Sequence, residues 1–106
     1  MHGVVTLVPG GQHVVSSYDE LMSIVDDVAN CVQSRRYVHA VFTICGVDEY
    51  APSKILQLAE RRGVNASVRY VDGCVLLVVD AIVVNFVKFV KELEGIAVGY
   101  RGEDKV

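Results

Sequence analysis

The sequence lacks the short motifs by which many enzymes and metalloproteins are recognised. It contains no GxGxxG or GxxxxGK[ST] phosphate loop and no CxxC pair, and its three histidines lie far apart. The three cysteines, Cys31, Cys45 and Cys74, are odd in number and widely spaced, a pattern typical of reduced, buried thiols in a cytosolic protein. We therefore expect no catalytic residues, no cofactor, no bound metal and no enzymatic activity.

Signals for export and membrane insertion are also missing. The N-terminal residues lack the basic segment and long apolar run of a signal peptide. The most apolar stretch, residues 74–90, is interrupted by Asp80, whereas a membrane span needs about 20 apolar residues with few charges. The net charge of −3 argues against a general nucleic-acid coat. These features predict a cytoplasmic protein that neither enters a membrane nor binds DNA.

Hydrophobic residues, in contrast, are abundant. They make up 52% of the 106 residues, against 22% charged residues. A chain of this length fills one core, so we expect residues 1–106 to form a single domain.

The spacing of the apolar residues predicts a β-α-β-α-β-β-α order, to which residues 96–100 can add a final edge strand. Expected strands cover residues 3–8, 37–45, 65–71 and 74–79. Strand–helix–strand units favour parallel neighbours, whereas Asp72-Gly73 predicts an antiparallel hairpin with a type I′ turn. The expected fold class is therefore α/β, with a mixed sheet packed against about three helices.

Local signals set the expected element ends. Ser17 and Glu20 have the spacing of a capping box at the start of the first helix. Gly63 is expected to end the second helix, and Asp80 to cap the third, over residues 81–93. The near-continuous apolar run 37–45 predicts a central strand that is covered on both faces.

Four arginines form the main candidate ligand site. Arg35 and Arg36 end the first predicted helix, and Arg61 and Arg62 end the second. If strands 37–45 and 65–71 run in the same direction, both helix ends lie at one rim of the sheet. The arginines would then either complement two helix dipoles or bind the phosphate groups of a ligand.

The third predicted helix is apolar around nearly its whole circumference, which is unusual for a surface helix in a small domain. We expect either a second helix or a protein partner to cover it, and we favour the partner. The residues expected at this interface are Val83, Phe86, Val87, Phe89 and Val90.

Several short segments can be compared with a known family: 13–17 (HVVSS), 34–36 (SRR), 44–46 (ICG), Ile55 and Ala59 within a helix, and 63–64 (GV). With these segments and this order of elements, the chain resembles the small tRNA-binding, kinase-associated subunit of the KEOPS complex over residues 4–95. It differs from that family in carrying His39 where an acidic residue is common, and in a longer loop after Gly46.

The resemblance implies a non-catalytic accessory subunit that binds an atypical kinase and contacts tRNA during threonylcarbamoyladenosine synthesis. A second similarity, to a wybutosine-synthesis protein, covers Val38-His39, the 54–62 helix and the hairpin. A different class also remains open, namely a homodimeric small-molecule-binding regulatory module that associates through the third helix.

Overall fold

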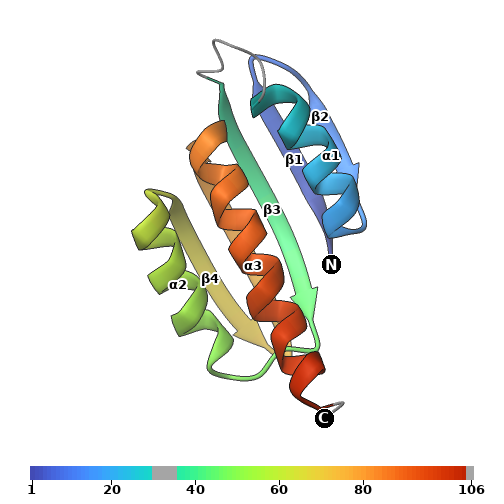
Figure 1. Ribbon diagram of the computed structural model, residues 1–106, viewed down its shortest axis with the longest axis vertical. Helices are drawn as coiled ribbons and strands as arrows, with labels where there is room; N and C mark the ends of the chain where they lie inside the picture. Colours follow the sequence, from blue (N-terminus) through green and yellow to red (C-terminus); the bar gives the residue numbers. More distant parts are fainter. Residues whose placement is uncertain (30–35, 105–106) are drawn as a thin grey trace.

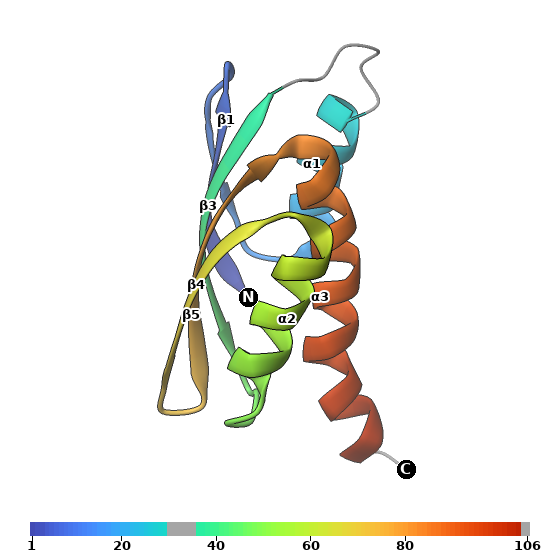
Figure 2. The same cartoon turned by 90° about the vertical axis from the view of Figure 1, so that its left-hand side faces the viewer.

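The computed structural model describes residues 1–29 and 36–104. Within them, one five-stranded sheet in the order β2-β1-β3-β5-β4 carries three helices on a single face (Figures 1 and 2). The elements are β1 (His2–Val8), β2 (Gln12–Val15), α1 (Tyr18–Ala29), β3 (Tyr37–Cys45), α2 (Ala51–Arg62), β4 (Asn65–Val71), β5 (Cys74–Ile82) and α3 (Val83–Asp104). The α/β class and the predicted order are confirmed, with β2 as an additional strand.

The sheet is antiparallel throughout, so the expectation of a mixed sheet with parallel neighbours is wrong. β5 folds back from β4 and inserts between β4 and β3, pairing antiparallel with both. β3 and β4 therefore run in the same direction without touching. The hairpin itself is as predicted, because Asp72 and Gly73 both have positive φ, 51° and 76°, as a type I′ turn requires.

Helix ends follow local signals in two cases. Ser17 Oγ accepts a hydrogen bond from the Glu20 amide, while the Glu20 carboxylate accepts one from the Ser16 amide rather than from that of Ser17. Gly63 ends α2 at φ 67°, where the amides that follow the helix reach the carbonyls of its last turn. The Ser17 cap and the glycine stop are therefore confirmed, whereas the return bond of the capping box goes to the amide of Ser16.

The third helix departs from prediction at both ends. Asp80 is not its cap, because β5 continues to Ile82 and the Val83 amide donates to the Arg36 carbonyl at 2.9 Å. Residues 96–100 are helical rather than an edge strand. Ile96 lies three residues beyond the buried Leu93 and packs against the same core, so a continued helix keeps both on the core-facing side.

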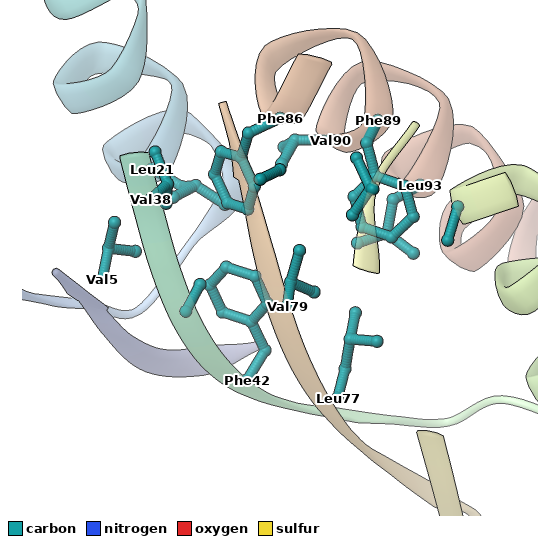
Figure 3. Close-up of a cluster of buried hydrophobic side chains, with 14 of the residues drawn as sticks. Val5, Leu21, Val38, Phe42, Leu77, Val79, Phe86, Phe89, Val90 and Leu93 are labelled. Carbon is teal, nitrogen blue, oxygen red and sulfur yellow. The ribbon is translucent and has the colours of Figure 1, made fainter. Parts of the chain in front are cut away.

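The core lies between the sheet and the helices. Phe42 of β3 and Phe86 of α3 stack at its centre, with ring centroids 6.1 Å apart (Figure 3), a separation at which offset aromatic pairs attract. α3 lies over the middle of the sheet, with α1 on one side and α2 on the other (Figure 1). The sheet and two neighbouring helices thus cover the apolar circumference of α3.

The other face of the sheet carries no helix (Figure 2). Burial alternates along β3, where Val38, Ala40, Phe42 and Ile44 are buried. The intervening side chains point away from the helices. The expectation that this strand is covered on both faces is therefore wrong: it is central, but one of its faces is open.

Candidate functional site: the open face and one end of the sheet

The open face of the sheet carries most of the exposed large hydrophobic side chains of the described chain. Seven of the eleven exposed large hydrophobic side chains project from it: Val4, Val8, Val14, Tyr37, Val71, Leu76 and Ile82. Val41 and Val78 lie between them on the two central strands and are half-buried. Contiguous exposed apolar surface of this kind marks interaction sites in proteins.

One row of polar residues with a member on every strand crosses this face, which also carries His2, Thr43, Ser67 and Arg69. The strand register places Gln12 beside Thr6, Thr6 beside His39, His39 beside Asp80, and Asp80 beside Asn65. We call these five residues, one from each strand, the polar row. On one side of it lie Val8, Tyr37 and Ile82, and on the other lie Val14, Val4, Val41 and Val78.

His39 and Asp80 are joined by a side-chain hydrogen bond at the centre of the polar row. His39 Nδ1 lies 2.7 Å from Asp80 Oδ1, and the two side chains are 49% and 60% exposed. The contact is possible because the two residues are direct partners in the β3–β5 ladder, where side chains on one face meet. It leaves the second ring nitrogen of His39 available for another contact.

Thr6, His39 and Asp80 are the residue types of a nucleophilic triad. Acyl transfer by such a triad also needs free amides that stabilise an oxyanion. β1, β3 and β5 are interior strands, so most of their amides are engaged in the ladders, except at the end of β5 beyond Asp80, where β4 offers no partner.

A hollow of about 380 Å³ opens at one end of the sheet, and we call it the rim hollow. It forms because β4 begins opposite Asp80, so that the last residues of β5 have no partner on that side. A smaller hollow of about 160 Å³ adjoins it and shares Asn65 and Asp80. The rim hollow is lined by Tyr37, Gly63, Val64, Asn65, Asp80, Ala81, Ile82 and Asn85.

The predicted arginines can be placed relative to this hollow, except Arg35, which lies outside the described residues. Arg36 precedes β3, and Arg61 and Arg62 end α2 just before β4. Because β3 and β4 both run antiparallel to β5, their first residues lie at the same end of the sheet. Tyr37 and Gly63 line the rim hollow. Arg36 directly precedes Tyr37 in sequence, and Arg61 lies two residues before Gly63.

Arg62 differs from the other two because it binds Glu92 of α3 through its Nε. The hydrogen bond from Arg62 is the main cause that holds the pKa of Glu92 below its ordinary value, and the same bond raises the pKa of Arg62. Both side chains are about two-fifths exposed, so the solvent screens this pair. Arg62 therefore links α2 to α3 in addition to following a helix end.

The expected partner interface on α3 is wrong for this chain. Phe86, Phe89, Val83 and Val90 are fully buried, and Val87 is 7% exposed. α1, α2 and the sheet cover these residues. Of the two alternatives for the third helix, a second helix or a protein partner, the structure therefore shows cover by helices of the same chain. Exposed apolar side chains are concentrated instead on the open face of the sheet.

The prediction of three reduced thiols is wrong for two of them. Cys45 and Cys74 are direct partners in the β3–β5 register and form a disulfide. They are 29 residues apart in sequence, and only the pairing of the two strands brings them together. In the described part of the chain, no three histidine, cysteine or acidic side chains are grouped so that they could hold a metal ion.

Sequence analysis missed the polar row and interpreted its two central members separately. His39 stands two residues after Tyr37, and Asp80 two residues before Ile82, so each interrupts a run of apolar positions on one strand face. A polar residue within an apolar strand face is the sequence signal that could have indicated this row. Only the strand register shows that the two residues are partners, because they are 41 residues apart in sequence.

None of the helices, as far as the chain is described, is long and apolar enough to cross a membrane. Comparison of the chain with protein-family models, with curated proteins and with solved structures finds no match.

Proposed function

We propose that this protein is a non-catalytic module that binds RNA at the end of its sheet. The observation that carries the proposal is that Arg36 and Arg61, 25 residues apart in the chain, each lie within two residues of a residue that lines the rim hollow. Guanidinium groups bind phosphate through paired hydrogen bonds. The net charge of −3 makes such contacts local rather than general.

The lining of the rim hollow supports an RNA base as the group bound between these arginines. Tyr37 is 60% exposed and offers an aromatic surface on which an unpaired base can stack. Asn65, Asn85 and Asp80 also line the hollow, and amide and carboxylate groups hydrogen-bond to base edges. Protein recognition of RNA sequence is directed mainly at such unpaired bases.

The resemblance to the KEOPS subunit makes tRNA the first RNA to test. In that case the protein would be an accessory subunit of the threonylcarbamoyladenosine-synthesis complex. The kinase subunit could not use the buried side of α3, so any such partner must bind elsewhere on the surface.

The test is a binding titration of fluorescent tRNA with the Arg36→Glu/Arg61→Glu double variant. We expect weaker binding and a shallower salt dependence, since each lost phosphate contact lowers the slope of log K against log salt by about one. Lys91→Glu is the control for charge reversal itself, because it replaces one exposed cation on α3 by a carboxylate and makes half of the charge change of the double variant.

Tyr37→Ala separates base stacking from charge. Loss of stacking on one base should weaken the free energy of RNA binding by about 1–3 kcal/mol. The substitution should leave the salt dependence of binding unchanged, because it removes no charge. Equal tRNA affinity for the wild type, the double arginine variant and Lys91→Glu would contradict the proposal.

A further inference from the structure

We infer that the open face of the sheet binds a second copy of this chain, face to face, around a two-fold axis parallel to β3. This inference does not depend on the RNA proposal, but the two surfaces share Tyr37, Asn65, Asp80 and Ile82, so a dimer would compete with RNA for these residues. It rests on the symmetry of the open face, on its size and on its distribution of charge.

On the open face, three of the four levels at which β3 pairs with both neighbours are symmetric about this strand. β3 has β1 on one side and β5 on the other. At the level of Tyr37, β1 carries Val8 and β5 carries Ile82; at that of His39, they carry Thr6 and Asp80; at that of Val41, they carry Val4 and Val78. The level of Thr43 is different, with His2 on β1 and Leu76 on β5.

A two-fold axis along β3 uses this symmetry. It places β1 of one copy over β5 of the other, so that Val4 faces Val78 of the second copy and Val41 faces its own equivalent. The Thr6 hydroxyl faces the Asp80 carboxylate of the second copy, to which it can donate a hydrogen bond. A surface that is complementary to itself in this way is what an isologous dimer requires.

This arrangement also agrees with how sheets pack. Rotation about an axis parallel to the strands keeps the strand directions of the two copies aligned. Twisted sheets that pack face to face keep their strands within about 30° of each other. In this arrangement the valines of each copy are covered by the other copy. His39 and Asp80 of the polar row keep a partner, because they bond to each other within each copy.

The size of the face is adequate. β3 and β5 are each nine residues long, and five strands spaced about 4.8 Å apart give a flat footprint of about 600 Å². Side-chain relief adds to this footprint, which brings it near the roughly 800 Å² per partner of a stable interface.

The charge distribution favours a second copy over a strongly charged partner. On the three central strands, Asp80 is the one acidic residue among the described open-face positions, and it is already paired with His39. Arg69 lies on the outer strand β4. The centre of the face, at Val41, carries no charge that would be repelled by its own copy.

Sedimentation velocity of the full chain over a range of concentrations tests the inference. We expect a monomer–dimer equilibrium, and Val4→Lys should raise the dimer dissociation constant by about 100-fold or more, because it places two unpaired charges in the interface. Val84→Lys is the matched control: Val84 is 41% exposed on the helix layer and Val4 is 36% exposed on the open face.

Wild-type protein that is monomeric at every concentration would overturn the inference. So would a Val4→Lys variant that is folded by circular dichroism and dimerises as well as the wild type. The wild-type measurement decides the question even if Val4→Lys fails to fold.

Cross-linking through introduced cysteines tests the axis. In a Cys31→Ser background, Val41→Cys should form a covalent dimer, because the two copies of residue 41 face each other. Val14→Cys should not, since it lies on β2, two strands from the axis. Equal cross-linking of both variants, or cross-linking of Val14→Cys alone, would refute this geometry.

Discussion

The two faces of this sheet are built from the same strands, but they present different side chains and differ in what covers them. On β3, the covered face presents Ala40, Phe42 and Ile44, and the open face presents His39, Val41 and Thr43. The covered side carries the aromatic ring that reaches α3, whereas the open side carries shorter β-branched residues and one member of the polar row. Hydrophobicity alone does not separate the two faces, because valine is frequent on both.

This difference separates stability from association. The covered face is filled by residues from all three helices (Figure 3), so its free energy is gained when the single chain folds. The apolar residues of the open face gain nothing until another surface covers them. Four predictions test this difference between the covered face and the open face. They are given in order of decreasing expected effect.

The largest effect is expected on the covered face. Phe42→Ala removes a fully buried ring that stacks on Phe86, and should lower the free energy of unfolding by about 3–5 kcal/mol. Its neighbour Val41 faces the open side, and Val41→Ala should cost about 1 kcal/mol or less. Urea unfolding at low protein concentration measures both. Equal losses would show that the two faces do not differ.

The next effect concerns a covalent link on the open side. Replacing both Cys45 and Cys74 by serine releases a loop of 29 residues, which should lower stability by about 3–4 kcal/mol in the chain-entropy description. Thiol titration of the unreduced, unfolded protein should find one free thiol, that of Cys31, among its three cysteines. Three free thiols would contradict the disulfide.

A smaller effect is expected at the start of a covering helix. Ser17→Ala removes the acceptor of the Glu20 amide and should cost about 1 kcal/mol. RNA binding and dimerisation should be unchanged, because α1 lies on the covered side. Ser17→Asp is the control, since aspartate caps equally well. A loss of RNA binding at unchanged stability would show that Ser17 belongs to a site.

The smallest effect concerns the ion pair between α2 and α3. Since Arg62 lowers the pKa of Glu92 in the folded protein, this pair stabilises the fold above the ordinary pKa of a glutamate and loses its effect as the pH falls through the lowered value. Glu92→Gln should therefore unfold slightly more easily than the wild type at neutral pH. Thermal unfolding curves of the two proteins should converge in acid, and a constant difference at all pH values would contradict the prediction.

Local sequence signals predicted well those features that depend on neighbouring residues. The hairpin turn at Asp72-Gly73, the end of α2 at Gly63 and the capping of α1 by Ser17 each involve atoms a few residues apart. Their conformations follow from the positive φ that glycine tolerates and from short side chains that accept amide hydrogen bonds. The order of the elements followed from these signals and from apolar spacing.

Features that join distant residues were predicted poorly. The apolar sequence pattern of residues 37–45 does not distinguish a strand covered on both faces from a strand covered on one face. For this reason the open side of β3 was not predicted. Asp80 was interpreted as a helix cap because its ladder partner, His39, is 41 residues away. Cys45 and Cys74 were expected to be reduced for the same reason.

The sequence by itself therefore determined the α/β class, the order of elements and the positions of the tight turns, because short-range sterics and hydrogen bonding decide these. Tertiary structure alone decided that β5 inserts between β3 and β4, that all three helices cover the same face, and that α3 is enclosed by its own chain. A single register then aligned one polar residue from each of five strands, since ladder pairing joins residues without regard to their distance in sequence.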